Sequence, residues 1–141
     1  MGFIVRLFLA IHVALYRATG GKIGARFMGG NVLILTTVGR RSGQRRDTPV
    51  MYVRDPEQDR YAVIASNGGA ATHPAWFHNA TAAGSAEIQV RDRQMAVGVR
   101  QATEEERARL WPLAVADYKG FDDYQKKTQR HIPMLLLDPH A

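Results

Sequence analysis

Four arginines lie in one short polar segment, Val38–Pro49, between two runs of strand-forming residues. Two apolar runs joined by a glycine-containing polar segment predict a β-hairpin with the charges at its tip. Arginine binds phosphate and carboxylate groups through two parallel N–H donors, and glycine lets the backbone approach a ligand closely. We therefore interpret the tip as a binding site for a polyanion, with a solvated basic turn as the alternative. The residues concerned are Gly39, Arg40, Arg41, Ser42, Gly43, Arg45 and Arg46.

Two later stretches supply the other parts of a pocket. Ala65–Gly69, at the end of a predicted strand, offers a hydroxyl, an amide and exposed backbone. Trp76 and Phe77, in a short predicted helix, offer flat apolar walls, although packing in the core explains them equally well. A basic arm, a hydrogen-bonding edge and an aromatic wall together suit a planar heterocycle with an anionic tail.

Other kinds of catalytic site are not supported by the sequence. The Gly-x-Gly-x-x-Gly pattern of nicotinamide-binding folds and the Walker loop of nucleotide hydrolases are both absent. His73 and His78 do not have the i, i+4 spacing that pairs zinc ligands on a helix, so we expect no metal site. Ser66 lies in no nucleophile elbow, and without cysteine the chain has no thiolate nucleophile.

The composition fits one globular domain with an affinity for anions. The chain has 141 residues, of which 45% are hydrophobic and 23% charged, and its formal net charge is +6. Such a charge favours nucleic acid, an acidic membrane surface, or a phosphorylated or polycarboxylate cofactor as partner. The arginines are bunched on one hairpin rather than spaced along a groove with aromatic residues, so we expect no nucleic-acid binding. The absence of cysteine is consistent with the cytoplasm.

The N-terminal stretch predicts an amphipathic helix over residues 3–16. It is shorter than the roughly 20 residues of a membrane-spanning helix, and Arg6 and His12 interrupt it, so we expect neither a span nor a signal peptide. We divide the chain into this helix with a linker, residues 1–28, and a cofactor-binding domain, residues 29–141. The helix either packs on the domain or makes peripheral contact with the inner face of the cell membrane, where the flanking basic residues suit anionic lipid.

The rest of the chain predicts short strands joined by hairpins, with helices inserted among them. Strands are predicted at residues 31–37, 50–53, 60–66, 86–90, 95–99 and 132–137, and helices at 74–83, 103–117 and 121–128. Thr103 and Glu106 form the pattern of a capping box, and Pro112 predicts a kink or a restart. This second helix should bury Leu110, Trp111, Leu113 and Ala114. The alternation favours an antiparallel sheet or small barrel over a parallel α/β fold.

Several blocks of the sequence resemble the deazaflavin-dependent nitroreductase family of actinobacteria. They are residues 33–43, Arg46-Asp-Thr-Pro49, Ala65-Ser66 with Gly68-Gly69, and His73-Pro-Ala-Trp-Phe-His-Asn79. The resemblance continues through residues 102–107, Trp111-Pro112, Tyr118 to Tyr124 and Ile132-Pro133. It therefore covers nearly all of the chain beyond the N-terminal helix. Because the blocks recur in the same order, the resemblance is more specific than any single motif.

The resemblance implies an α+β protein, mainly β, with the antiparallel split β-barrel of FMN-binding proteins and with coenzyme F420 as cofactor. This 8-hydroxy-5-deazaflavin bears a phospholactyl-oligoglutamate tail, which is a polyanion. By the family pattern, its phosphate and carboxylates are held by Arg40, Arg41, Ser42 and Arg46. The ring is lined by Asp47, Thr48, Pro49, Val50, Met51, Ile64, Ala65, Ser66 and Asn67, and the site is closed by Ala75, Trp76, Phe77, His78, Asn79 and Phe121.

The resemblance also implies a reductase that passes hydride from C5 of the reduced cofactor to a quinone, an activated enone or a nitroaromatic compound. The protein then orients the two rings and excludes water. Ser66, Tyr118 and Tyr124 are the candidate proton donors or substrate-orienting groups, in competition with solvent.

Three residues depart from the family pattern: Asn67, Met51 and Phe121. These departures argue against bulky nitroimidazole substrates and leave the natural acceptor open. The alternatives are an FMN-binding reductase on the same barrel and a non-catalytic F420 carrier. We expect the protein to be a monomer or a homodimer.

Overall fold

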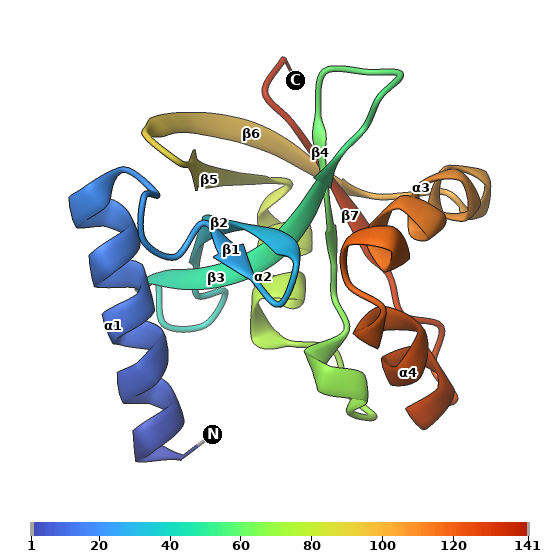
Figure 1. The fold of residues 1–141 in the computed structure, drawn as a ribbon, viewed down its shortest axis with the longest axis horizontal. Helices are drawn as coiled ribbons and strands as arrows, with labels where there is room; N and C mark the ends of the chain where they lie inside the picture. Colours follow the sequence, from blue (N-terminus) through green and yellow to red (C-terminus); the bar gives the residue numbers. More distant parts are fainter. Residues whose placement is uncertain (1, 141) are drawn as a thin grey trace.

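Six antiparallel strands close into a barrel in the computed structural model, which describes residues 2–140 (Figure 1). The strands are hydrogen-bonded in the order β2-β3-β4-β7-β6-β5, and β5 pairs with β2 to close the ring. A further short strand, β1, pairs with the start of β2. The strands are β1 (Arg26–Phe27), β2 (Gly30–Val38), β3 (Arg45–Arg54), β4 (Tyr61–Ile64), β5 (Ser85–Val90), β6 (Arg93–Gln101) and β7 (Met134–Asp138).

The wall of the barrel has apolar layers on both of its faces. On β2, Leu33 and Leu35 pack in the interior core with Val50 of β3, whereas Ile34 between them packs outside against Tyr16. These three β2 side chains are fully buried. Burial on both faces explains why this strand is a continuous apolar run in the sequence rather than an alternating one.

In the described part of the chain, four α-helices cover the barrel: α1 (Phe3–Thr19), α2 (Ala75–Ala83), α3 (Glu104–Asp117) and α4 (Gly120–Lys127). Figure 1 shows α1 on one side of the barrel and α3 and α4 on the other. α2 contributes Phe77 and Ala80 to the interior core. α3 and α4 contribute Leu110 and Phe121 to a second core on the outer faces of β3, β4 and β7. The helices therefore supply the second layer that each sheet face needs.

The second half of α1 is attached to the barrel, whereas its first half presents apolar side chains to solvent. Tyr16 is fully buried, and its hydroxyl accepts a hydrogen bond from the Arg91 amide at 2.7 Å and lies 2.9 Å from the Val32 carbonyl oxygen. By contrast, Phe3 and Phe8 are 79% and 56% exposed. None of the helices within residues 2–140 is long and apolar enough to cross a membrane. The division of the chain at residue 28 stays a prediction.

The antiparallel barrel and the predicted helices are confirmed, with corrections of detail. β3 begins at Arg45, so the hairpin turn is residues 39–44 rather than 38–49, because pairing with β2 continues to its end and outweighs the low strand propensity of charged residues. The Thr103 capping box is confirmed, and α3 continues through Pro112 without a restart. Leu113 is 38% exposed, because the buried stripe of α3 runs through residues 110 and 114.

A network of ion pairs joins the β3–β4 turn to α3. The buried carboxylate of Asp55 accepts two hydrogen bonds from Arg109, at 2.7 and 2.8 Å, and one from Arg60, at 3.0 Å. Arg60 also reaches Glu106, which accepts two hydrogen bonds of 2.7 Å from Arg100. Hydrogen bonding to Arg109 holds the pKa of Asp55 well below its usual range, and hydrogen bonding to Arg100 does the same for the pKa of Glu106.

Candidate functional site

The hairpin turn between β2 and β3 is docked on α2. The main-chain N–H and Nη1 of Arg40 both donate to Oδ1 of Asn79, at 3.1 and 3.2 Å. Asn79 is buried, so it fixes the turn against the helix. Within the turn, the Ser42 hydroxyl accepts from the Gln44 amide, and Gly43 adopts a φ of +70°, which glycine tolerates without strain. The turn therefore has a defined shape in which the Arg40 guanidinium lies over α2.

The predicted arginine cluster divides between the two faces of β3. Arg45 forms an ion pair with Glu87 of β5 at 2.6 Å. Arg46, the next residue of the strand, points to the opposite face. Arg41 and Arg46 are exposed, and within residues 2–140 neither forms an ion pair. The positive charge that remains for a ligand is therefore concentrated at Arg41 and Arg46, beside Arg40.

The hydroxyl of Thr37 lies on the same face as Arg46. The strand register pairs Thr37 directly with Arg46, and residues paired in this way point to one side of the sheet. Thr37 is 3% exposed, and its Oγ1 has no hydrogen-bond partner in the part of the chain that the structure describes. A buried polar atom left without a partner costs about 1–3 kcal/mol. The exposed guanidinium groups of Arg41 and Arg46 are donors of the kind that phosphate and carboxylate groups accept from, so the residues present fit such a group.

The stretch of β3 predicted to line the ring also alternates between the two faces. Thr48 and Val50 lie on the inner face, and Asp47, Pro49 and Met51 lie on the outer face. The Asp47 carboxylate accepts a hydrogen bond from Arg17 at 3.0 Å, on the side of the barrel that α1 covers. Met51 packs in the outer core together with Ile64 and Phe121. The structure thus brings Met51, Ile64 and Phe121 together and separates them from Asp47.

Arg130 holds the segment that follows β4, a role that sequence reasoning missed. Its guanidinium donates to the carbonyl oxygens of Ser66 at 2.7 Å, of Ala70 at 2.9 Å and of Ala65 at 3.2 Å. The segment includes Asn67, which adopts a φ of +48°. An isolated arginine beyond the last predicted helix carries no local pattern, and only the folded chain reveals its partners. Arg130 therefore fixes the edge that was predicted to hydrogen-bond a ligand.

α2 connects this edge with the arginine turn. Trp76 is half-buried against the interior core, and Phe77 is buried within it, so core packing does account for much of Phe77. Ala75 is exposed at the start of the helix, and the ring of half-buried His78 lies 5.4 Å from that of Phe77. Asn79, the residue after His78, holds the arginine-rich hairpin turn. One short helix thus touches both parts of the predicted site.

The two predicted tyrosines meet between α3 and α4. The hydroxyl oxygens of Tyr118 and Tyr124 are 2.8 Å apart, and both rings pack against Phe121. The hydrogen bond to Tyr124, together with burial, raises the pKa of Tyr118 to about 12. Gly69 packs closely on the backbone of Tyr124, since a Cβ there would lie 2.9 Å from the Tyr124 carbonyl oxygen. The tyrosine pair is therefore adjacent to the segment that contains Ser66.

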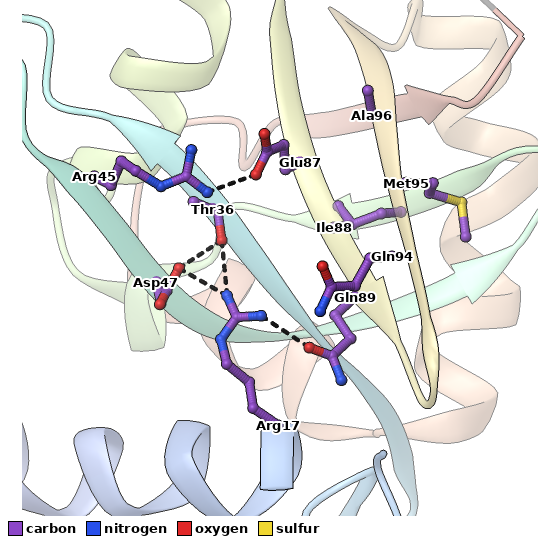
Figure 2. Close-up of a pocket in the computed structure, with 10 residues that line it drawn as sticks. All are labelled: Arg17, Thr36, Arg45, Asp47, Glu87, Ile88, Gln89, Gln94, Met95 and Ala96. Atoms are coloured by element: carbon purple, nitrogen blue, oxygen red, sulfur yellow. Dashed lines mark hydrogen bonds and ion pairs between the residues drawn. The ribbon is translucent and has the colours of Figure 1, made fainter.

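A pocket with a volume of about 400 Å³ lies on another part of the barrel. Figure 2 shows that its charged groups face one another: Arg17 binds Asp47, and Arg45 binds Glu87. It is lined by Arg17, Thr36, Arg45, Asp47, Glu87, Ile88, Gln89, Gln94, Met95 and Ala96. Of the residues that the family pattern assigns to the cofactor, only Asp47 lines this pocket, and of the arginine-rich turn, only Arg45 does. Because its charges neutralise one another, this pocket fits a polyanion less well than the face that carries Arg46.

Two solved structures share this fold, and one of them is described as a reductase. The structure of an F420-H2 dependent reductase, FDR-A, matches with a TM-score of 0.69 and 35% sequence identity, covering 76% of this chain and 93% of that chain. A protein described as a domain-swapped dimer matches with a TM-score of 0.72 and 31% identity, covering 95% of this chain and 96% of that chain. The fold and the site define an oxidoreductase of the split-barrel, F420-dependent class.

Sequence comparison identifies the family within this class. The model of the F420H(2)-dependent quinone reductase family matches residues 8–139. The F420H(2)-dependent quinone reductase Rv1261c of Mycobacterium tuberculosis is 36% identical over 133 residues, which are 92% of this chain and 88% of that protein. This chain belongs to the F420H(2)-dependent quinone reductase family. The resemblance found in the sequence blocks is confirmed, and with it coenzyme F420 rather than FMN as the cofactor that the family implies.

Proposed function

We propose that this protein transfers hydride from reduced coenzyme F420 to a quinone. The observation that supports this most directly is the pair of exposed arginines, Arg41 and Arg46, which form no ion pair within residues 2–140. A tail of phosphate and carboxylates fits this set of donors, because arginine binds each such group with two hydrogen bonds. The lone phosphate of FMN needs fewer of them, which makes FMN the weaker candidate.

The roles of the site residues follow from their positions. The anionic tail is held by Arg40, Arg41, Ser42 and Arg46. The ring lies against the end of β4 and the aromatic side chains of α2, where it is bordered by Ala65, Ser66, Asn67, Trp76 and His78. Thr48 borders it from the inner face of β3, whereas Met51, Ile64 and Phe121 support this wall from the outer core. The bound deazaflavin supplies the hydride, while the protein orients the acceptor and excludes water.

A conjugated acceptor also needs a proton after the hydride arrives. Tyr118 and Tyr124 share one hydrogen bond, and Ser66 lies on the neighbouring segment. With a pKa of about 12, Tyr118 keeps its proton across the physiological range and can orient or protonate an acceptor oxygen. Quinones and activated enones, in which a carbonyl oxygen is conjugated with the accepting carbon and takes up the developing negative charge, therefore suit the site. Nitroaromatic compounds are a further acceptor class, and bulky nitroimidazoles are disfavoured.

The proposal is tested by titrating the purified protein with oxidised coenzyme F420 and, in parallel, with FMN. Micromolar or tighter binding of F420, followed by oxidation of reduced F420 on addition of menadione, is the expected result. Binding of FMN alone would keep the fold and replace the reaction. Binding of F420 without turnover on any quinone, enone or nitroaromatic compound would leave a carrier rather than an enzyme. Binding of neither cofactor would refute the proposal.

We also propose that the exposed face of α1 makes peripheral contact with anionic membrane. Phe3, Ile4, Leu7, Phe8, Ile11 and Leu15 are all at least 41% exposed and recur at helical spacing. α1 carries Arg6 and Arg17 and no acidic residue, and Lys22 and Arg26 follow it. An apolar stripe with basic neighbours is the pattern of a helix that lies in a lipid interface.

Co-sedimentation with vesicles tests this contact. Deletion of residues 1–16 is unsuitable because it removes the buried Tyr16, so point variants are preferable. The double variant Phe3→Ser/Phe8→Ser should lose binding to phosphatidylglycerol vesicles and retain its fold. Val38→Ser is the control, because Val38 is a 48% exposed apolar residue at the end of β2, outside α1. Equal sedimentation of the two variants would contradict the proposal.

The oligomeric state is a separate question. The match to a domain-swapped dimer supports a homodimer, with a monomer as the other expected state. Light scattering of the wild type and of Phe3→Ser/Phe8→Ser distinguishes the two states and shows whether the α1 stripe is used between copies of the chain instead of at lipid.

A further inference from the structure

Arg130 and His73 meet beside the proposed ring site. Nη1 of Arg130 lies 2.8 Å from Nδ1 of His73, while the same guanidinium donates to the carbonyl oxygens of Ala65 and Ser66. Arginine carries only donors and stays protonated in proteins. Nδ1 of His73 must therefore accept this hydrogen bond. In a neutral imidazole the remaining proton is then on Nε2.

The surroundings of His73 also keep its imidazole uncharged. Its ring lies 4.6 Å from that of Phe77 and 5.7 Å from that of His78, both on α2. Arg130 faces it from the segment before β7, and Lys127 of α4 donates to a neighbouring carbonyl oxygen. Burial lowers the pKa of His73, and the charges of Arg130 and His78 lower it further. No carboxylate contacts His73 within the described residues to offset these effects.

We propose that His73 donates a hydrogen bond from Nε2 to the bound cofactor, and that Arg130 is a positioning residue that acts through it. His73 is half-buried, and its Nε2 has no hydrogen-bond partner within residues 2–140. The Arg130 guanidinium links His73 to the carbonyl oxygens of Ala65 and Ser66, which lie at the edge where we place the ring. The group it would take is a carbonyl oxygen of the deazaflavin ring. This inference rests on the proposed cofactor site.

The arrangement makes His73 a hydrogen-bond donor that is uncharged at neutral pH. A histidine with an ordinary pKa near 6.5 would become a cation within the physiological range. Protonating Nδ1 here would place that cation 2.8 Å from Arg130 and break their hydrogen bond. Arg130 therefore fixes the tautomer and, together with burial, favours the neutral state. As a result, cofactor affinity should vary little through this residue at and above neutral pH.

The tautomer is tested on the cofactor-free protein by NMR of the ¹⁵N-labelled imidazole rings. Wild-type His73 should titrate below the ordinary pKa of about 6.5 and, when neutral, carry its proton on Nε2. In Arg130→Gln the pKa of the ring should rise, because the charge of Arg130 is lost while the burial of the ring remains. Arg130→Lys restores a positive charge and should return the pKa of His73 to a low value, and melting curves show whether both variants are folded. A wild-type ring protonated on Nδ1, or titrating normally, would overturn the inference.

The contact with the cofactor is tested by the affinity for oxidised F420 as a function of pH. His73→Phe, which keeps the ring and its packing, should weaken binding about tenfold at every pH. The exposed His131, which pairs with Glu104, provides the control variant His131→Phe, with unchanged binding expected. Arg130→Gln should make the affinity pH-dependent, and adding His73→Phe to it should abolish that dependence.

The outcomes separate this inference from the proposed function. If the wild type does not bind F420, the proposed function fails, and the ligand contact of His73 fails with it, while the NMR result stands on its own. If the wild type binds F420 and His73→Phe binds equally well, the proposed function stands and the contact is refuted. If Arg130→Gln changes the pH dependence even when residue 73 is phenylalanine, Arg130 does not act through His73.

Discussion

Arginine is used in opposite ways in two regions of this barrel. In the fold network, defined as Arg60, Arg100 and Arg109 with Asp55 and Glu106, each guanidinium is bound to a carboxylate. The ligand arginines, defined as Arg41 and Arg46, are exposed and form no ion pair within residues 2–140. Both regions use the same cationic side chain, so the difference lies in what each guanidinium faces.

The contrast follows from the cost of removing charge from water. A buried guanidinium such as that of Arg60, whose side chain is 6% exposed, is tolerated only with a carboxylate partner. An exposed guanidinium keeps its hydration and needs no partner, so it stays available for a ligand. Arg45 is an internal control within the hairpin, since it is as exposed as its neighbours and yet is bound to Glu87. Pairing, rather than clustering in the sequence, separates structural arginines from ligand arginines.

The largest expected effect is on the fold network. Asp55→Asn removes the charge that Arg60 and Arg109 share and should lower the free energy of unfolding by about 3 kcal/mol, because the buried Arg60 then keeps only Glu106 as a carboxylate partner. Asp59→Asn, at a pair whose side chains are 51% and 62% exposed, should cost less than about 1 kcal/mol. Urea unfolding measures both. Equal losses would show that burial does not decide the value of these pairs.

Acid should remove the same stabilisation gradually. The pKa of Asp55 and that of Glu106 are lower in the folded protein than in the unfolded chain. Their contribution is therefore complete above the unfolded values of about 4 and is lost as the pH falls below them. The urea midpoint should stay nearly constant from pH 7 to about pH 5 and then fall. In Asp55→Asn this fall should be smaller, and an unchanged fall would assign it to other groups.

The ligand arginines should give the opposite result. Arg41→Ala/Arg46→Ala should weaken F420 binding about 100-fold, because two charge-assisted hydrogen bonds are lost. The free energy of unfolding should change by less than about 0.5 kcal/mol, as expected for exposed residues without partners. Arg45→Ala is the matched control, with a change in affinity of less than about threefold, since its guanidinium is already bound to Glu87. If Arg45→Ala weakens F420 binding as much as Arg41→Ala/Arg46→Ala does, the affinity depends on the total positive charge rather than on particular arginines.

Much of the fold could be predicted from local patterns. The Thr103 capping box, the paired strands and the helix after Pro74 all depend on residues close in sequence, and the structure confirms each. The short strand β1 at Arg26–Phe27 was not predicted, because two residues give no periodicity. The limits of β3 were wrong because cross-strand pairing with β2 decided them, and pairing is a property of two segments.

The site was harder to predict because its geometry depends on contacts between distant residues. The residue types at Arg40–Arg46 indicated a polyanion, but they could not show that Arg45 is bound by Glu87, forty-two residues further on. Arg130 is sixty-five residues from Ala65, and neither residue carries a signal of the other. The sequence thus indicates the chemistry of a site, while the folded chain decides which members of a set of like residues can take part.

The smallest expected effect concerns the pair Tyr118 and Tyr124, which belongs to neither arginine region and carries no charge. Tyr118→Phe and Tyr124→Phe should each cost about 1 kcal/mol of stability, because each removes the same hydrogen bond. The double variant should cost no more than the worse single variant, since the remaining hydroxyl of each single variant has already lost its partner. Additive losses of stability would mean that each hydroxyl has a separate partner.

Because the pKa of Tyr118 is about 12, quinone turnover should show no loss assignable to its ionisation below about pH 11. An alkaline loss of turnover near pH 10 that disappears in Tyr118→Phe would mean that the hydrogen bond to Tyr124 is broken when the acceptor is bound.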